Sequence, residues 1–193
     1  MTDGNHCIWT HSPTTEWNEG YPIGNGRLGG MILGEPLAER VALNHDRLWR
    51  QYWCYQRKDT HKDLPRLREL YRAGKWEEAH DLLLQTLPQS GPAVYVNPFM
   101  PVCDLTLYPV HDDKPVENYR RCLDMDTGVV TVSYRVEGIE YKREYFSSWP
   151  AQVMAIRLSA SQAARVRGEV SLTRLLDPDC DVTGSSRLGE VVL

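Results

Sequence analysis

Residues 24–29 read GNGRLG, which matches the G-x-G-x-x-G fingerprint of a dinucleotide-binding turn, and Asp46 follows 20 residues after Gly26. Such a site requires a strand that enters the glycines and a helix that leaves them. Pro22 is poorly suited to a central strand, and the Gly-Glu-Pro sequence at 34–36 would break the helix. Without a helix N-terminus no pyrophosphate is held. The stretch therefore predicts a glycine-rich hairpin and no cofactor.

Metal binding and nucleophilic catalysis find little support in the sequence. His6, Cys7 and His11 lie close together, but they belong to a terminal segment, and the chain contains no C-x-x-C or H-x-x-x-H spacing. A G-x-S-x-G nucleophile motif is also missing, and the serines at 147–148 are expected at a strand end. We therefore predict no metal site and assign no nucleophile.

Carboxylates are the other candidates for chemistry, because glycoside hydrolysis needs two of them on either side of the scissile bond. The acidic residues considered are Glu16, Glu19, Asp46, Asp104, Asp124 and Asp126. Nothing in their spacing defines a pair. Asp124 and Asp126 precede Thr127-Gly128 and are typical of a turn. We therefore assign no catalytic residue.

Aromatic side chains are concentrated in the first third of the chain. They are Trp9, Trp17, Trp49, Tyr52, Trp53 and Tyr55. Such rings can stack on sugar faces, and they can equally serve core or interface packing. The sequence favours packing but leaves both interpretations open.

Composition places these residues in an ordinary globular protein. The 193 residues suit one domain, with 41% hydrophobic and 25% charged residues and a net charge of −4. The basic residues are dispersed, which argues against nucleic acid or an anionic membrane as partner. No apolar run reaches the roughly 18 residues of a membrane span. The N-terminus lacks signal-peptide features, so we expect a cytoplasmic protein. Five scattered cysteines (Cys7, Cys54, Cys103, Cys122 and Cys180) are expected to be free thiols.

Hydrophobic periodicity predicts a mainly β fold with one helical insertion. Alternating or apolar segments occur at 28–33, 41–43, 104–110, 130–136, 139–145, 152–160 and 169–176, separated by turns. They predict an antiparallel β-sandwich. Helical spacing at 63–87, with Asp63 as cap, Pro65 in the first turn and Gly74 between two helices, predicts a small helical hairpin. The segment RLGEVVL at 187–193 is typical of a strand that is still running, so we expect a single domain over 1–193 that is incomplete at its C-terminus.

Six phrases in fixed order carry a family resemblance. They are WNEGYPIGNGRLGGMILG, ERVALNHDRLW, LRELYRAGKWEEAHDLL, DLTL, YRRCLDMDTGVVTVSY and YKREYFSSWPAQVMAIRL. Together they resemble the N-terminal domain of glycoside hydrolase family 95, the α-L-fucosidases and related α-L-galactosidases. The resemblance implies a β-sandwich with a helical insertion, followed in family members by an (α/α)6 barrel that holds the catalytic acid and base. It also implies inverting hydrolysis of a terminal α-L-fucosyl bond without a cofactor.

The barrel has no counterpart in this sequence, so the expected role is to pack on such a barrel and help shape its sugar pocket. Loop chemistry and position in the family pattern give Asn25, Arg27, Asn44 and Trp49 as substrate-pocket candidates. The expected ligand is a fucosylated or related L-sugar glycan, bound through the parent enzyme. His45 and Arg47 depart from the family pattern, which leaves the sugar open. A stand-alone carbohydrate-binding module and a protein-interaction domain that uses the 63–87 helices remain as alternatives.

Overall fold

The computed structural model describes residues 6–50, 61–86, 98–111, 114–178, 180–187 and 189–192. The chain divides into two compact units, one formed by Met1–Leu48 with Phe99–Leu193 and the other by Trp49–Pro98. Tyr52, Trp53, Cys54 and Tyr55 lie outside the described residues. The two units are described separately below.

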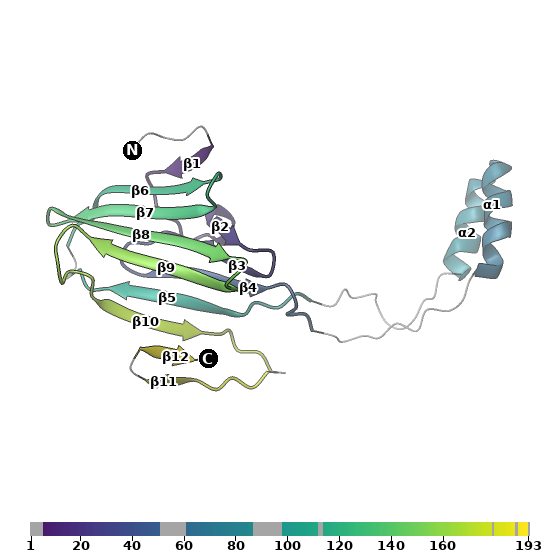
Figure 1. Cartoon of the computed structure of the whole chain (residues 1–193). Helices are drawn as coiled ribbons and strands as arrows, with labels where there is room; N and C mark the ends of the chain where they lie inside the picture. Colours follow the sequence, from purple (N-terminus) through teal and green to yellow (C-terminus); the bar gives the residue numbers. More distant parts are fainter. Residues whose placement is uncertain are drawn as a thin grey trace. The chain divides into compact units, whose positions relative to one another are not determined.

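The first unit is built from two antiparallel sheets of five strands (Figure 1). One sheet has the order β1-β6-β7-β8-β9, with β1 Cys7–Thr10, β6 Glu117–Asp124, β7 Val129–Val136, β8 Ile139–Ser148 and β9 Val153–Ala160. The other has the order β10-β5-β4-β3-β2, with β10 Gly168–Thr173, β5 Cys103–Pro109, β4 Glu39–His45, β3 Leu28–Ile32 and β2 Tyr21–Gly24. The prediction of a mainly β antiparallel sandwich is confirmed.

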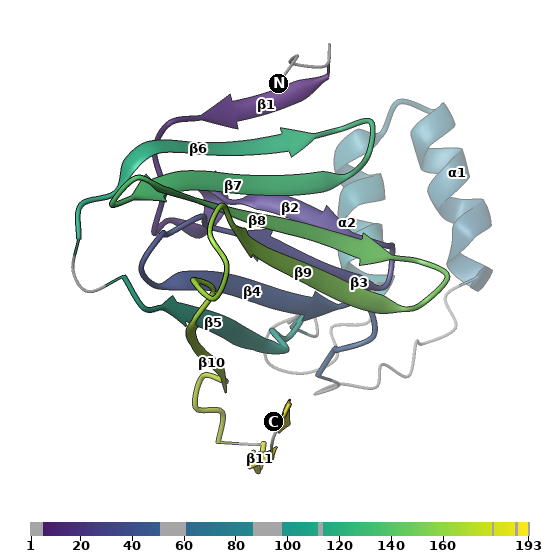
Figure 2. The same cartoon turned by 60° about the vertical axis from the view of Figure 1, so that its left-hand side comes forward.

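The core lies between these sheets, because each contributes the apolar side of its alternating strands. Along β7 every second residue is buried, as its sequence alternation predicts. The core combines Ile23, Ile32 and Val41 from one sheet with Tyr119, Val130, Val132, Tyr134, Val136 and Tyr145 from the other. Figure 2 shows the two sheets as layers seen partly edge-on. The sandwich is therefore held by one continuous apolar interior.

Edge positions explain two features of the sequence. Pro22, which is unsuited to a central strand, lies in β2 at the edge of its sheet. The strand β1 at 7–10 was not predicted, because its four residues carry no clear alternation, yet it pairs with β6 from Cys7–Asp124 to Thr10–Arg121. A short 3-10 helix, η1 Trp17–Glu19, connects β1 and β2.

The strands of the C-terminal part differ in their bounds from those predicted. The expected strand at 169–176 ends at Thr173, and the Arg174 side chain bonds to the carbonyl oxygens of Pro101 and Val102 instead. A two-stranded hairpin follows, with β11 Ser185–Arg187 and β12 Glu190–Val192. The segment 187–193, expected as one running strand, is therefore divided by a turn at Gly189, which has φ +79°.

The second unit contains two helices, α1 Leu64–Arg72 and α2 Trp76–Thr86, preceded by a 3-10 turn, η2 His61–Asp63. They fall within the insertion predicted at 63–87, whose last residue lies outside the described part. Gly74 separates them with φ +70°, as its left-handed role requires. Asp63 occupies the cap position but makes no side-chain capping bond, so that detail of the prediction is wrong. Only Leu67, Leu70 and Ala79 are buried among the described residues of this unit.

Candidate functional site

The glycine-rich hairpin places two of the four candidates in one turn between β2 and β3. The Asn25 side-chain oxygen accepts hydrogen bonds from the backbone N–H groups of Arg27 (3.0 Å) and Leu28 (2.8 Å). Gly26 has φ +82° with open space where a Cβ would be, whereas a Cβ at Gly30 would lie 3.1 Å from Met154. The glycines therefore serve a tight turn and close packing between sheets, and neither role involves a nucleotide.

The rest of the Asn25 side chain ties this turn to the other sheet. Its amide nitrogen donates to the backbone oxygen of Ser148, at the end of β8, over 2.9 Å. Because its oxygen and nitrogen both bond within the domain, Asn25 holds the turn in place. Its part in substrate binding stays a prediction.

Arg27 is the functional group that the turn presents. Its guanidinium carbon lies 5.8 Å from the ring centroid of Trp149, in the turn between β8 and β9, which is within cation–π range. The Trp149 side chain is 58% exposed. Together they form a surface pair at the end of the sandwich, with a cation and an apolar ring face both open to a ligand or a neighbouring domain.

The other two candidates, Asn44 and Trp49, come from other segments of the chain. Asn44 lies on β4, opposite Gly29 of β3, and lines a separate groove. Trp49 belongs to the other compact unit and is 56% exposed. Within the first unit, the structure therefore brings Asn25 and Arg27 together and sets Asn44 on another strand of the same sheet.

A buried polar cluster, which the sequence did not predict, fixes the connection between β3 and β4. Glu39 is fully buried, and its carboxylate accepts bonds from Arg143 Nη1 (3.1 Å), the Tyr145 hydroxyl (3.0 Å) and the Gly34 N–H (2.8 Å). Arg143 also donates to the Tyr134 hydroxyl (2.8 Å) and to the backbone oxygens of Glu35 and Pro36. Burial raises the pKa of the Glu39 carboxyl, and the attraction of Arg143 opposes this rise.

A second arginine reinforces the same connection. Arg121 donates from β6 to the backbone oxygens of Ile32 (3.2 Å) and Leu33 (2.5 Å), and the Tyr119 hydroxyl donates to that of Gly34 (2.8 Å). Gly34 has φ +85°, and a Cβ there would lie 2.3 Å from the Tyr119 hydroxyl oxygen. We call the set of Glu39, Tyr119, Arg121, Arg143 and Tyr145 the arginine clamp. Its full burial makes it a structural support and removes it from contact with substrate.

Most of the six carboxylates considered as candidates for chemistry have structural partners. Glu19 accepts a bond from the Thr14 hydroxyl (2.7 Å), and Asp104 pairs with Arg40 (2.8 Å). Asp124 accepts the N–H of Asp126 (2.9 Å), and this bond lowers the pKa of its carboxyl. Asp126 pairs with His6 (2.8 Å), and Asp46 pairs with His45 (3.1 Å). We assign no role to Glu16. No carboxylate pair therefore stands out as a hydrolytic centre in the described part of the chain.

Other site types are likewise not found in the described ranges. No group of three or more His, Cys, Asp or Glu residues there is arranged to hold a metal ion. No helix in that part is long and apolar enough to cross a membrane. Cys7, Cys103 and Cys180 are free thiols.

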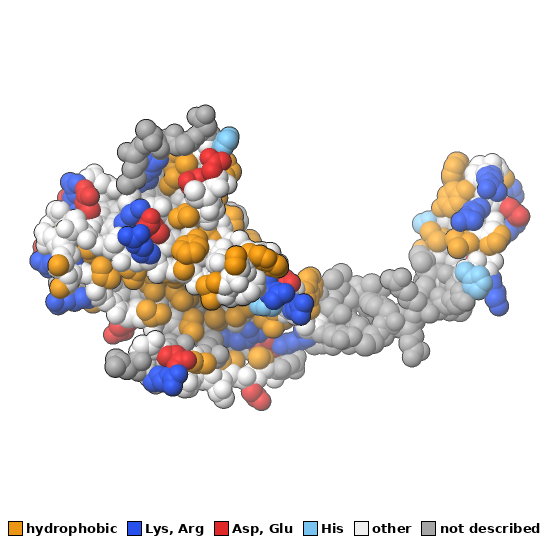
Figure 3. Space-filling view, in the orientation of Figure 1, with side chains coloured by type: hydrophobic (Ala, Val, Ile, Leu, Met, Phe, Trp, Pro, Cys, Tyr) orange, Lys and Arg blue, Asp and Glu red, His pale blue; other side chains and the backbone are white. Residues whose placement is uncertain are grey.

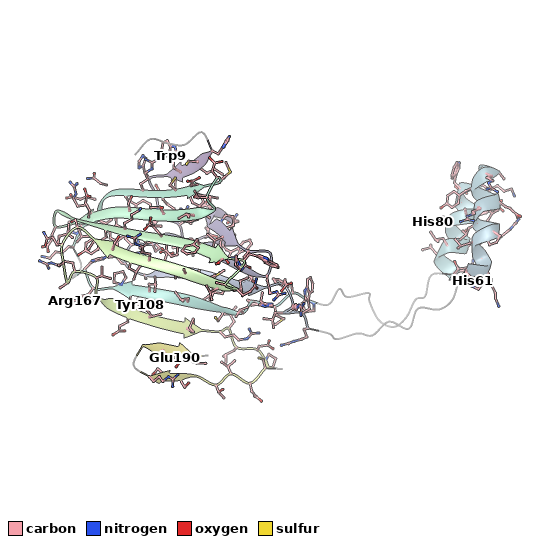
Figure 4. All side chains as sticks on the ribbon, viewed as in Figure 1. Trp9, His61, His80, Tyr108, Arg167 and Glu190 are labelled. Carbon is pink, nitrogen blue, oxygen red and sulfur yellow. The ribbon has the colours of Figure 1, made fainter. Side chains whose placement is uncertain are left out.

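An opening with mostly apolar walls lies at the edges of β9 and β10. This cleft of about 210 Å³ is lined by Tyr134, Tyr141, Leu158, Val170 and other residues between the sheets. Figure 3 shows apolar side chains gathered on the sandwich surface in this region. Arg167 and Tyr108 mark the end of the cleft at which β10 begins and β5 ends (Figure 4). Its walls combine core residues such as Tyr134 with the exposed Leu158 and Val170 and with charged residues such as Arg167, so nothing in the lining defines a specific ligand.

Comparison with known proteins identifies relatives for most of the chain. Residues 8–189 match the family model described as glycosyl hydrolase family 65, N-terminal domain. "Alpha-L-fucosidase 2" of Arabidopsis thaliana is 31% identical over 160 residues, which cover 82% of this chain and 19% of that protein. "Probable alpha-fucosidase A" is 31% identical in Aspergillus oryzae, over 81% of this chain and 22% of that protein, and 28% identical in Aspergillus niger, over 81% and 20%. The chain thus spans about a fifth of the length of these curated relatives.

Proposed function

The chain belongs to the glycosyl hydrolase family 65 N-terminal domain family, and on that premise we propose that it serves an α-L-fucosidase-like enzyme as a non-catalytic domain. The observation that carries this proposal is the match to α-fucosidases at 31% identity over more than four fifths of the chain. The same relatives support the narrower resemblance to family 95, although the matching model carries the family 65 description.

The catalytic groups belong, on this proposal, to a helical barrel domain on which the sandwich packs. An inverting glycosidase needs two carboxyl groups about 6.5–9.5 Å apart across the sugar. Most of the six candidate carboxylates are instead engaged in turns and ion pairs, as with Asp124 and Asp104. The domain therefore supplies binding and positioning, and the barrel supplies proton transfer to and from the glycosidic bond.

Arg27 is the residue that we assign to the sugar pocket of this enzyme. Asn25 fixes the turn from both sides, so the Arg27 backbone is held while its guanidinium stays at the surface beside Trp149. A guanidinium offers several N–H donors to sugar hydroxyl oxygens, and a tryptophan ring offers an apolar face to the sugar ring. Such contacts would orient a terminal L-fucosyl or related L-sugar unit.

A chimeric enzyme tests this role directly. We would exchange the matching N-terminal segment of the Arabidopsis relative for this chain and measure kcat/KM on an aryl α-L-fucoside. Arg27→Ala should lower kcat/KM about tenfold or more, because a charge-assisted contact to substrate is lost. The matched control is Arg135→Ala, which removes a surface arginine paired with Glu140. The assignment is wrong if Arg27→Ala lowers only the stability of the chimera and leaves kcat/KM unchanged.

The isolated chain provides the second arm of the test. We expect no release of fucose from the aryl fucoside by the purified 193-residue chain. Measurable turnover that survives removal of trace contaminants would place a catalytic site within the chain and overturn the non-catalytic role.

A further inference from the structure

A groove of about 220 Å³ opens on the face of the β10-β5-β4-β3-β2 sheet that points away from the core. Val41 and Leu43 of β4 pack into the core, so the alternating residues Arg40, Ala42 and Asn44 lie on the outer face. Ala42, in the middle of this row, has the smallest side chain of the three. Asn44 faces Gly29 across the β3–β4 ladder, where no side chain competes for space. The small Ala42 side chain thus leaves room for the hollow.

The polar groups of the groove are held in fixed pairs. Arg40 Nε bonds to the Asp104 carboxylate at 2.8 Å from the neighbouring strand β5. Arg174, at another side of the groove, bonds to the backbone oxygen of Val102 at 2.6 Å and lies 3.7 Å from Asp177. Each arginine is therefore matched by a carboxylate, and the groove carries no excess charge that would select an ionic ligand.

Apolar side chains form the walls of the same groove. Trp17 on η1 is 52% exposed, and Phe99 and Leu175 line the groove as well. Phe99 is positioned by the continued ladder between the two strands, in which Met100 N–H bonds to the Leu48 oxygen (2.9 Å) and Val102 N–H to the Leu43 oxygen (3.0 Å). Aromatic rings at the rim of a small pocket with planar polar groups on its floor can contact both the face and the hydroxyl groups of a sugar.

We propose that this groove binds one neutral pyranose ring of a glycan. The ring face would lie against Trp17, and its hydroxyl groups would bond to the Asn44 amide and to the Arg40–Asp104 pair. Amide, carboxylate and guanidinium groups together supply both donors and acceptors, as sugar hydroxyls require. The site is additional to the Arg27–Trp149 pair at the β2–β3 turn, and it needs no catalytic domain.

Saturation-transfer NMR on the purified chain tests the proposal with three neutral probes: methyl α-L-fucopyranoside, methyl β-D-galactopyranoside and methyl α-D-glucopyranoside. At least one should receive saturation from the protein and quench tryptophan fluorescence. Trp17→Ala and Asn44→Ala should each weaken binding about fivefold or more, since each removes a direct contact. The matched control is Trp76→Ala, which removes a 63% exposed tryptophan from α2 in the other unit and should leave binding unchanged.

Several outcomes would overturn the proposal. One is the absence of saturation transfer to all three probes. Another is binding that persists in Asn44→Ala, a variant whose fold is checked by circular dichroism, or that is lost in Trp76→Ala. A response to sodium glucuronate stronger than to every neutral probe would show an anion site instead. The chain is tested here without any catalytic domain. A negative binding result therefore does not bear on the proposed hydrolase role, and a negative result with the chimeric enzyme does not bear on sugar binding in the groove.

Discussion

The sandwich and the helical pair bury very different numbers of apolar residues. The sandwich has a core of nine buried residues drawn from both sheets. The arginine clamp holds the connection between β3 and β4 by hydrogen bonds within the same interior. The helical pair buries three residues, and it exposes the Trp76 and Tyr71 rings, which meet edge to face at 5.4 Å. Helices of 9 and 11 residues are also shorter than the roughly 12–15 residues at which isolated helices become stable in water.

This difference indicates that stability resides in the sandwich. A small apolar contact between two short helices cannot offset the conformational entropy of ordering them. The sandwich, by contrast, holds charged groups in its core, which is costly unless every partner is present. We therefore expect the sandwich to respond sharply to loss of one clamp residue and to tolerate changes in the helices.

The largest effect should come from Arg143→Ala. The variant leaves the Glu39 carboxyl in an apolar interior and removes the donor from two backbone oxygens of the β3–β4 connection. Breaking a buried pair in this way costs about 3–5 kcal/mol of unfolding free energy. Urea denaturation followed by tryptophan fluorescence would measure it. Arg135→Ala, a surface arginine of β7, should cost less than about 1 kcal/mol and serves as the matched control. Equal losses of unfolding free energy in the two variants would show that the clamp stabilises the sandwich no more than a surface ion pair does.

Glu39→Gln should change how stability depends on pH. Burial raises the folded-state pKa of Glu39 above its ordinary value of 4.5, so the folded chain binds this proton more tightly than the unfolded chain. The contribution of Glu39 to stability is therefore full below pH 4.5 and falls as pH rises through the folded-state pKa. Relative to the wild type, Glu39→Gln should become less destabilising as pH increases from about 4 towards neutrality. Unfolding free energies measured across this range give the slope, and a penalty that grows with pH would show the opposite shift.

Asn25→Ala should have an intermediate effect, because it removes three hydrogen bonds that fix the turn between β2 and β3. The loss should be about 1–3 kcal/mol, typical of polar groups left without partners. Asn44→Ala makes the same chemical change on the outer face of the sheet and should cost less than about 0.5 kcal/mol. Thermal unfolding of both variants gives the comparison. If Asn44→Ala is the more damaging, the turn is not the structural anchor that we describe.

Local patterns in the sequence account for the strands and helices but not for the contacts between them. Alternation predicts β7, and the spacing of Leu67 and Leu70 with Gly74 predicts the helical turn, because the causes lie within a few residues. The phase of alternation also offers a signal that was missed. Arg143 lies two residues before Tyr145 on the inward face of β8, which is an unusual place for a charge.

The partners of such residues depend on the tertiary register. Glu39 lies 104 positions from Arg143, and the Ser148 oxygen lies 123 positions from Asn25, so no local pattern joins them. Asn25 was predicted as a substrate-pocket residue, and only the packing of β8 beside the turn shows that its amide bonds to the Ser148 oxygen within the domain. The groove around Asn44 combines segments near residues 17, 40–44, 99–104 and 174–175, which the sheet order alone brings together.

The smallest effect on the sandwich should follow from removing the helical unit altogether. Leu48 and Met100 lie side by side, with the Met100 N–H donating to the Leu48 oxygen at 2.9 Å, so a Gly-Asn-Gly turn can replace Trp49–Pro98. The midpoint of thermal unfolding should change by less than roughly 4 °C, equivalent to about 1 kcal/mol in a domain of this size.

A peptide of residues 61–86 is the counterpart of this deletion and should show little helical circular dichroism in water. A stable helical peptide, or a sandwich that no longer unfolds cooperatively without the insertion, would show that the helical unit carries stability of its own. If both expectations hold, what keeps these helices ordered lies outside their own contacts, and the exposed Trp76 and Tyr71 rings are the first place to look for it.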